Sequence, residues 1–405
     1  KAIWVTAFLF LAQSGAGFAQ TASHAVTPDR VLHGTVRLDP AIPAGGRYAA
    51  GTVVTVTAVP DAGYVLDSVY YSTKGRWGAM YYESMRSPFR VTVDREMHVG
   101  ASFIEKSGVA HVDVVQDVVY ARPGIKPLKY DVFAPKGARR LPCILIIHGG
   151  GWATNTEDIM RGMARELTRS GRYVVFSMDY RWAQKGDGDA ANTSMANIIE
   201  DVYGAIAHIM EHAAEYGADP SRIALTGDSA GGHLAAAAAN MPNRIGRGGF
   251  GTRAGVFEFL PSYLPKGKSV EQARSEIAAA IQAAAPSYGV FGGALLNHYS
   301  DDPAADETWR RAISPLDNIP DAKDRAVPHY LIRGTRDPLI TDETHREYVD
   351  ALVKAGQSVE YVQVGGASHA FFDWKPDEAT QATFARYGVY YCADMESFFD
   401  SIFYK

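Results

Sequence analysis

Apolar and polar residues alternate along the chain between about residues 28 and 105. The stretches 53–59 and 89–93 carry apolar residues at every second position, which is the period of a β-strand with one buried face. Gly45-Gly46, Pro60-Asp61-Ala62-Gly63 and Ser87-Pro88 separate such stretches and are typical of turns. Since no part of this region has a helical period, we predict a small all-β domain over residues 28–105.

From residue 110 to 405 the pattern changes to short apolar runs that alternate with stretches of helical period. Residues 194–216 repeat apolar side chains along one helical face, and Gly217 ends the repeat. Such alternation is typical of an α/β fold with a mostly parallel sheet and helices on both faces. The predicted strands are 112–119, 128–133, 142–147, 173–179, 222–227, 328–334 and 359–364.

Residues 243–281 interrupt this alternation. They contain a loop rich in Gly and Arg, then a group of aromatic residues, and then the start of a stretch of helical period that we assign to 270–285. Because a long irregular segment inside a compact domain is usually functional, we interpret it as a lid-like insertion over a site.

The first nineteen residues have the pattern of a secretory signal peptide. Lys1 precedes the apolar run 2–12, and small residues surround Ala19, as expected before a cleavage site. The run is short for a membrane span, although a retained anchor is the alternative. Either reading exports the rest of the chain, so we expect a secreted or periplasmic protein.

The composition, with 47% hydrophobic and 21% charged residues and a net charge of −5, is that of a soluble globular protein. It gives no sign of a nucleic-acid partner, and we expect no stable membrane span. The chain has two cysteines, Cys143 in an apolar run and Cys392 in a C-terminal helical stretch. We expect buried thiols, with a single disulfide between them as the alternative.

The sequence Gly-Asp-Ser-Ala-Gly at 227–231 stands between the apolar strand 222–227 and a helix of small residues over 230–239. A serine on such a sharp strand-to-helix turn is the nucleophile of a nucleophile elbow, and the flanking glycines allow the neighbouring chain to approach closely. The motif alone is weak evidence, but its context favours Ser229 as a nucleophile.

A serine hydroxyl needs an imidazole to take its proton and a carboxylate to orient that imidazole. Asp337 follows the strand 328–334, and His369 follows the strand 359–364. Both lie beyond strand ends on the sheet edge that carries Ser229, in the order serine, acid, histidine. We therefore predict a catalytic triad of these three residues.

Other titratable residues compete for these roles. Asp342 is placed at the start of a helix, where a carboxylate suits the helix dipole. His329 enters a strand and His345 falls inside a helix, so neither occupies a loop after a strand. Asp228 and His233 flank the serine, and we expect them to support the elbow and its helix rather than to react.

A glycine triplet follows the apolar strand 143–147, within the sequence His-Gly-Gly-Gly-Trp at 148–152. Glycines there can direct backbone N–H groups at a developing oxyanion without interference from side chains. We predict the N–H groups of Gly150, Gly151 and Ala230 as the oxyanion hole.

Aromatic residues gather near the predicted site. Trp152 adjoins the glycine loop, Trp182 follows a strand, and Phe371 comes two residues after the predicted base. They indicate a substrate-binding pocket for an acyl or aryl group. Aromatic packing of the core at the roots of these loops explains the pattern equally well.

The motifs at 148–152 and 227–232, together with Asp337 and His369, resemble those of α/β-hydrolase serine esterases. The resemblance is to the bacterial feruloyl and acetyl-xylan type and to the hormone-sensitive-lipase-like carboxylesterases. It implies ester hydrolysis through an acyl-enzyme, without a metal or an organic cofactor. In place of the helical N-terminal cap usual in the lipase-like group, this chain has the all-β region.

The all-β region resembles a bacterial cell-surface β-repeat in three stretches, 51–58, 60–64 and 99–103. The resemblance implies an accessory or spacer role, with a cell surface or a polysaccharide as the partner.

The sequence thus predicts an exported serine carboxylesterase for small acyl or aryl and feruloyl esters, including esters of polysaccharide or polyester. The alternatives are a serine peptidase of the prolyl-oligopeptidase type and a non-catalytic hydrolase-fold binding protein. The sequence does not identify the natural ester, the acyl preference or the oligomeric state.

Overall fold

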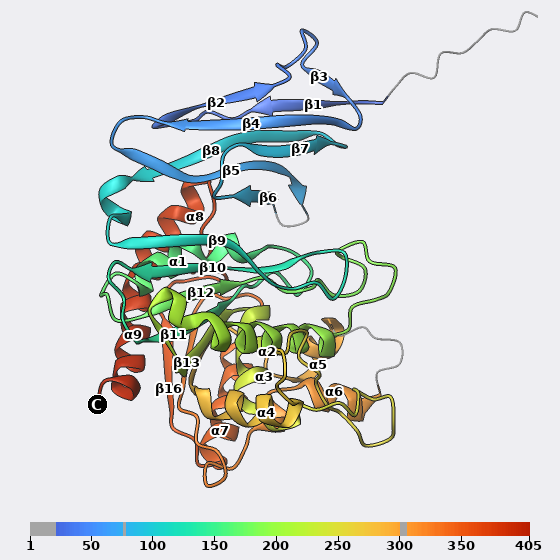
Figure 1. The fold of residues 1–405 in the computed structure, drawn as a ribbon, viewed down its shortest axis with the longest axis vertical. Helices are drawn as coiled ribbons and strands as arrows, with labels where there is room; N and C mark the ends of the chain where they lie inside the picture. Colours follow the sequence, from blue (N-terminus) through green and yellow to red (C-terminus); the bar gives the residue numbers. More distant parts are fainter. Residues whose placement is uncertain (1–21, 76–77, 300–305) are drawn as a thin grey trace, which may run out of the picture.

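The computed structural model describes residues 22–75, 78–299 and 306–405. The predicted signal peptide, residues 1–19, lies outside them. The N-terminal part, residues 22–105, is called the β-module here and folds as two sheets (Figure 1), one of five strands in the order β3-β1-β8-β5-β6 and one of three in the order β2-β4-β7. Its strands are β1 (Ser23–Pro28), β2 (Gly34–Asp39), β3 (Arg47–Ala49), β4 (Thr52–Pro60), β5 (Tyr64–Gly75), β6 (Gly78–Ser84), β7 (Phe89–Val93) and β8 (Met97–Glu105).

The two sheets of the β-module enclose a hydrophobic core of their own. In β4, Val54, Val56 and Ala58 are buried while the residues between them face outward, because successive side chains of a strand point to opposite faces. The first strand begins at Ser23, before residue 28. Its only buried residue is Val26, so it carries no alternating pattern by which the sequence could reveal it.

The remaining residues, 110–405, are called the larger domain and contain an eight-stranded sheet in the order β16-β15-β14-β13-β11-β12-β10-β9. Strand β10 is antiparallel to both of its neighbours, β12 and the edge strand β9, and all other neighbouring strands are parallel, which matches the predicted α/β fold. The strands are β9 (Val112–Ala121), β10 (Leu128–Pro135), β11 (Leu141–Ile147), β12 (Val174–Met178), β13 (Ala218–Asp228), β14 (Ile281–Ser287), β15 (His329–Gly334) and β16 (Val359–Val364).

The α-helices of the described residues are α1 (Arg161–Leu167), α2 (Met195–His212), α3 (Ala230–Asn240), α4 (Val270–Ala280), α5 (Gly293–Tyr299), α6 (Glu307–Ile313), α7 (Asp342–Lys354), α8 (Glu378–Thr383) and α9 (Val389–Phe403). Shorter helical turns are η1 (Lys106–Val109), η2 (Glu157–Met160), η3 (Ala213–Tyr216), η4 (Pro242–Arg244), η5 (Leu316–Asn318) and η6 (Phe384–Gly388).

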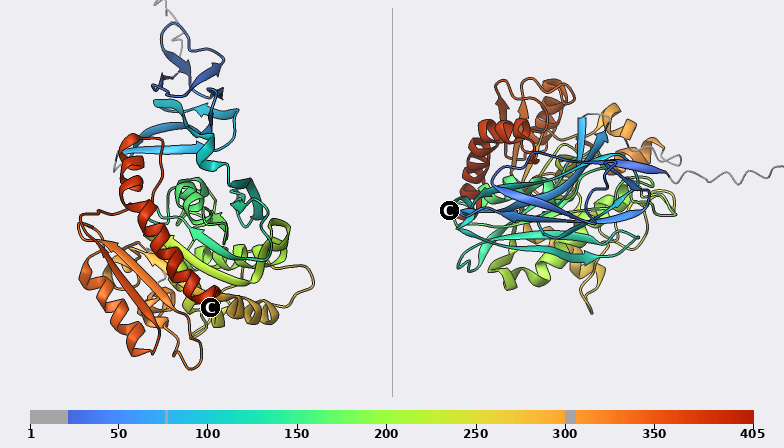
Figure 2. Two further views of the ribbon diagram at one scale, coloured as in Figure 1. Left: turned by 90° about the vertical axis from the view of Figure 1, so that its left-hand side faces the viewer. Right: turned by 90° about the horizontal axis from the view of Figure 1, so that it is seen from above.

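Helices cover both faces of the sheet. Helices α1 and α9 contact one another and the sheet, while α2, α3 and α4 form a second packed group, and Figure 1 shows the two groups on opposite sides. The central strand β11 is therefore buried over nearly its whole length, as expected of a parallel strand covered on both faces. Figure 2 shows the β-module stacked on one end of this domain, with α9 running along its side.

The prediction of a helix over residues 270–285 is wrong in its last five residues, 281–285. Helix α4 ends at Ala280, and Ile281–Ser287 forms strand β14 between β13 and β15. The segment is rich in alanine, which has the strongest helix propensity. Pairing with two neighbouring strands and nearly complete burial outweigh that local preference.

The predicted lid-like insertion, residues 243–281, packs along the outer surface of α2. The backbone N–H of Ser262 donates to the Glu200 carbonyl, and the N–H of Leu260 donates to the Glu200 carboxylate. Tyr263 contacts the ring of His208 edge to face. The insertion is thus held against the helical layer, and its role as a lid stays a prediction.

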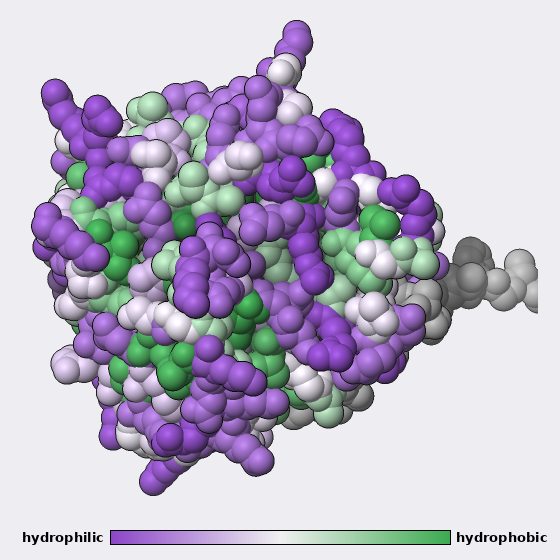
Figure 3. Space-filling model, turned by 90° about the horizontal axis from the view of Figure 1, so that it is seen from below, coloured by the Kyte–Doolittle hydropathy of each residue, from purple (hydrophilic) through white to green (hydrophobic). Residues whose placement is uncertain are grey.

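Cys143 and Cys392 are both buried free thiols, which confirms the first of the two alternatives for them. Among the described helices, none has the length and apolar character required to cross a bilayer. Figure 3 shows the end of the larger domain that faces away from the β-module, where hydrophilic residues predominate and apolar ones form small patches between them.

Candidate active site

Ser229 lies on the sharp turn between β13 and α3, with φ +53° and ψ −114°. This is a strained conformation for a residue with a side chain, and the neighbouring glycines explain how it is accommodated. A Cβ on Gly227 would lie 2.5 Å from the carbonyl oxygen of Ile147, and one on Gly231 would overlap the same oxygen. The close approach of β11 therefore requires both glycines, as the motif predicts.

The structure brings Ser229, His369 and Asp337 together. Nε2 of His369 lies 2.9 Å from Oγ of Ser229, and Nδ1 lies 2.7 Å from Oδ2 of Asp337. The acid follows β15 and the histidine follows β16, so the three residues meet at the carboxyl edge of the parallel sheet. Residues 140 positions apart in the sequence thus form one hydrogen-bonded relay.

The carboxylate of Asp337 is held from both sides. Oδ2 faces His369, while Oδ1 accepts the backbone N–H groups of Leu339 and Ile340 at 2.8 and 2.9 Å. Burial alone would raise the pKa of Asp337, but the hydrogen bond and charge of His369, with the two N–H groups, hold it below the ordinary value. The carboxylate is thus kept ionised and oriented at neutral pH.

The competing residues occupy other places. Asp342 is half-buried at the start of α7, where it pairs with Arg346 and accepts a hydrogen bond from the Tyr361 hydroxyl. His329 is buried in β15 and His345 in α7. Burial lowers the pKa of His329 to about 4 and that of His345 to about 3, so both are neutral residues of the interior.

The glycine loop after β11 has the open backbone expected of an oxyanion hole. Gly150 and Gly151 have φ of +119° and +60°, a region that glycine enters at little cost. Across residues 22–75, 78–299 and 306–405, no protein group accepts a hydrogen bond from the N–H of Gly150, Gly151 or Ala230. These three predicted donors are therefore available to a ligand.

Asp228 and His233 support the loop and the elbow. Oδ1 of Asp228 accepts the N–H of Gly149 at 2.6 Å. His233 accepts from the indole N–H of Trp152 at 3.2 Å through Nδ1, and its Nε2 lies 3.0 Å from the Ile313 carbonyl. Burial lowers the pKa of His233 to about 4, so the neutral ring accepts at one nitrogen and donates at the other.

A second set of residues, whose contacts no sequence motif indicates, also holds the loop. Asp179, directly after β12, lies 3.3 Å from Nε2 of His148 and 2.7 Å from Nζ of Lys126. Tyr180 donates its hydroxyl to the His148 carbonyl and stacks on the His148 ring. In the sequence, Asp179 ends the predicted strand 173–179 and Tyr180 follows it directly, which is the signal by which both could have been found.

Two of the three aromatics predicted to bind substrate are inaccessible. Trp152 and Phe371 are 1% and 0% exposed, and Phe371 packs against Tyr288 and Phe372. A side chain without exposed surface cannot contact a substrate. Trp152 and Phe371 therefore follow the alternative interpretation, in which these aromatic residues pack the core. Trp182 is half-buried, and its indole N–H donates to the Asn155 carbonyl beside the glycine loop.

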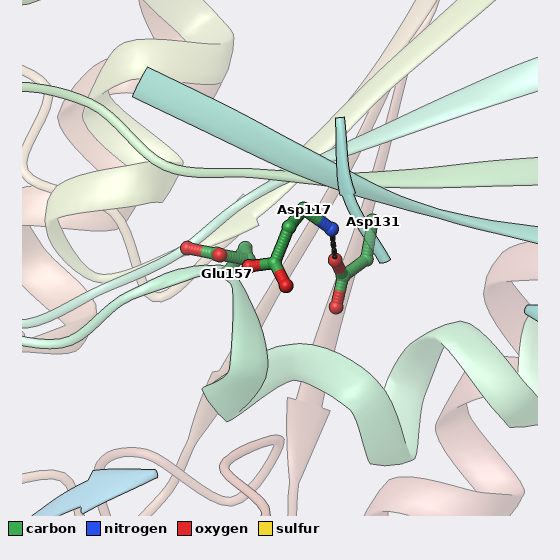
Figure 4. A group of neighbouring side chains, drawn as sticks. All are labelled: Asp117, Asp131 and Glu157. Atoms are coloured by element: carbon green, nitrogen blue, oxygen red, sulfur yellow. Dashed lines mark hydrogen bonds between the residues drawn. The ribbon is translucent and has the colours of Figure 1, made fainter. Parts of the chain in front are cut away.

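Three carboxylates, those of Asp117, Asp131 and Glu157, converge between β9, β10 and η2 (Figure 4). Their oxygens are close enough together to hold a metal ion. However, Nζ of Lys129 lies 2.5 Å from Asp117 and 2.8 Å from Glu157, so a cation of the chain itself already pairs with two of the three. Burial, with the charge of Glu157 second, raises the pKa of Asp131 to about 8.

Comparison with known proteins gives two family matches. Residues 144–373 match the family described as alpha/beta hydrolase fold, a span that includes the elbow, the glycine loop, Asp337 and His369. Residues 25–107 match the divergent InlB B-repeat domain, which agrees with the predicted β-repeat.

Similar proteins include two from Mycobacterium tuberculosis. The carboxylic ester hydrolase LipN is 29% identical over 65% of this chain and 65% of its own length. The esterase LipQ is 27% identical over 62% of this chain and 53% of its own length. The chain therefore spans less than two thirds of each.

Among solved structures, Thermogutta terrifontis esterase 2 phosphonylated by cyclosarin is 26% identical. The match covers 68% of this chain and 91% of that one, with a TM-score of 0.49.

Proposed function

The chain belongs to the alpha/beta hydrolase fold family, and we propose that it is a serine carboxylic ester hydrolase that acts through Ser229, His369 and Asp337. The observation that carries the proposal is the relay in which His369 lies 2.9 Å from the Ser229 hydroxyl and 2.7 Å from Asp337. Relatives named as a carboxylic ester hydrolase and an esterase support the same reaction.

The chemistry follows from this geometry. His369 takes the proton of Ser229 through Nε2 while Oγ attacks the ester carbonyl carbon. The resulting oxyanion accepts hydrogen bonds from the backbone N–H groups of Gly150, Gly151 and Ala230, each worth about 3 kcal/mol of transition-state stabilisation in related chemistry. His369 then gives the proton to the departing alcohol, and a water molecule, activated in the same way, releases the acid and regenerates Ser229.

Replacing the nucleophile tests the proposal directly. Ser229→Ala removes Oγ from a half-buried position, and we expect hydrolysis of p-nitrophenyl acetate and butyrate to fall to the background rate while circular dichroism shows a folded protein. Ser221→Ala is the matched control, because this exposed serine lies on β13, the strand that leads to the nucleophile, eight residues before it. Turnover by Ser229→Ala at the wild-type rate would exclude the proposed mechanism.

For the substrate we propose esters with a small acyl or an aryl group, feruloyl esters included, carried on polysaccharide or polyester. The half-buried indole of Trp182 beside the glycine loop supports an aryl group. A panel of p-nitrophenyl esters of increasing acyl length, methyl ferulate and acetylated xylan measures the preference. A dipeptidyl anilide belongs in the same panel, because its hydrolysis in preference to every ester would indicate a peptidase instead.

We also propose that the enzyme is secreted or periplasmic. The support is the apolar run 2–12 and the small residues near Ala19. Fractionation of expressing bacteria, with N-terminal sequencing of the product, tests this, and a product that keeps residues 1–19 in the cytoplasmic fraction would contradict it.

A further inference from the structure

One carboxylate of the β-module is buried inside the larger domain. Asp67, in β5, is 1% exposed and accepts four hydrogen bonds. Oδ1 accepts Nε of Arg161 at 3.0 Å and Nη1 of Arg165 at 2.7 Å. Oδ2 accepts Nη2 of Arg161 and the indole N–H of Trp374, both at 2.9 Å. The side chains of Asp67 and Arg161 are both fully excluded from solvent.

The two main partners belong to the two loops that carry the proposed chemistry. Arg161 begins α1, directly after the segment 148–160 that contains Gly150 and Gly151. Trp374 stands five residues after His369. A single side chain of the β-module therefore holds the end of the oxyanion loop and the end of the histidine loop at the same time.

Contacts inside the larger domain connect these two anchors. The backbone N–H of Trp374 donates to the Ile159 carbonyl at 3.0 Å. Trp374 leaves no room for a side chain at position 162, where an added Cβ would lie 2.9 Å from the Cβ of Trp374 and 3.0 Å from its ring. Nη1 of Arg161 donates to the Asp158 carbonyl at 2.8 Å. The anchors thus form one packed unit beneath the β-module.

The β-module completes the charge balance of this unit. Nη2 of Arg161 also contacts Ser68 at 3.2 Å and Glu83 at 2.7 Å, and both residues belong to the β-module. A guanidinium without exposed surface needs such partners, because an unpaired buried charge is costly. The pair Asp67 and Arg161 is bidentate, which fixes orientation as well as distance.

We propose that Asp67 is a positioning residue for the reaction, so that the β-module forms part of the active site and is more than a spacer. Through Arg161 it fixes the loop of the oxyanion donors, and through Trp374 it fixes the loop of His369. The inference rests on the proposed function, since it concerns the geometry in which Ser229, His369 and the N–H donors act. Small displacements of such groups are costly to the rate, with a shift of about 1 Å worth up to about 10²-fold.

Two variants of the full chain test the proposal. Trp374→Phe removes the indole N–H but keeps an aromatic ring beside residue 162, and it leaves the Asp67 and Arg161 pair intact. We expect kcat for p-nitrophenyl acetate to fall about tenfold, with KM changed by less than about threefold. Asp67→Asn removes the charge that holds both loops, and we expect a fall of about 10²-fold in kcat.

Arg86→Ala is the matched control. Arg86 also links the β-module to the larger domain, through Gln116 at 2.9 Å and Asp117 at 3.1 Å, but it is exposed and contacts neither catalytic loop. Its kcat should equal that of the wild type. Thermal unfolding and near-ultraviolet circular dichroism establish that each variant is folded.

The outcomes separate the inference from the proposed function. A lower kcat at constant KM in folded Trp374→Phe, with Arg86→Ala unaffected, supports positioning. A folded Trp374→Phe variant with the wild-type kcat overturns the positioning proposal, and this result decides the question even if Asp67→Asn does not fold. A loss of kcat in Arg86→Ala equal to that in Trp374→Phe also overturns it. Full activity of Ser229→Ala would instead refute the proposed function, because Ser229 would then not be the nucleophile of the reaction.

Discussion

Replacing Asp337 by Asn changes the proton position on His369 while preserving the shape of the site. In the structure Oδ1 of Asp337 accepts the N–H groups of Leu339 and Ile340, and only Oδ2 faces Nδ1 of His369. The amide oxygen of an asparagine would keep the hydrogen bonds from the two backbone N–H groups. Its NH₂ group would then face the histidine. Since NH₂ can only donate, Nδ1 must then accept, and the imidazole proton moves to Nε2.

That proton would occupy the position from which the base acts. Nε2 lies 2.9 Å from the Ser229 hydroxyl and must have a free lone pair to take its proton. The equivalent change in a serine protease triad lowers kcat about 10⁴-fold, which corresponds to about 5 kcal/mol of transition-state free energy at about 1.4 kcal/mol for each factor of ten. We expect a loss of this size, because the backbone contacts that select the wrong tautomer are present here.

The assay is kcat and KM for p-nitrophenyl acetate at pH 7.5, with protein folding followed by circular dichroism. Asp342→Asn is the matched control, since Asp342 is the neighbouring acid but lies at the start of α7 and pairs with Arg346. Its kcat should stay within about twofold of the wild type. A folded Asp337→Asn variant with more than about one tenth of the wild-type kcat would refute the tautomer argument.

Three further results are expected. Arg161→Met should lower the free energy of unfolding by about 3 to 5 kcal/mol in urea titrations, because it removes the cation that pairs with the buried carboxylate of Glu83 and leaves Asp67 with Arg165 alone. A change below about 1 kcal/mol would contradict this. Burial raises the pKa of Asp131 to about 8, above its unfolded value of about 3.9, so the stability linked to its protonated form is fully present below pH 4 and is lost as pH rises through 8. Unfolding of Asp131→Asn should therefore depend less on pH between 5 and 9 than that of the wild type, and equal slopes would argue against the raised pKa. Burial also raises the pKa of both Cys143 and Cys392, so a thiol reagent should label neither until the protein unfolds, and rapid labelling of the native protein would show that they are accessible.

The residue pattern alone was sufficient for much of the fold and for the centre of the site. Parallel strands buried on both faces appear as continuous apolar runs, which is why the strand 142–147 could be assigned from the sequence. The elbow around Ser229 needs glycines at fixed positions, and hydrolase chain order then selects Asp337 and His369. These features are local, since each depends on residues within a few positions of one another or on their order along the chain.

Other features depend on contacts between segments far apart in the sequence, and only the tertiary structure decided them. The alanine-rich strand β14 exists because β13 and β15 pair with it, although its own residues favour a helix. Trp152 and Phe371 look like pocket residues in the sequence, but neighbouring elements bury them.

The contact of Asp67 with Arg161 and Trp374 joins residues 94 and 307 positions apart, and no local pattern marks these three residues. The periodicity of a sequence indicates which face of a helix or strand is buried. It does not indicate which other segment of the chain packs against that face, because long-range packing decides this. The three residues of the proposed triad could therefore be selected from the sequence, whereas the connection between the β-module and the loops of the proposed site required the folded chain.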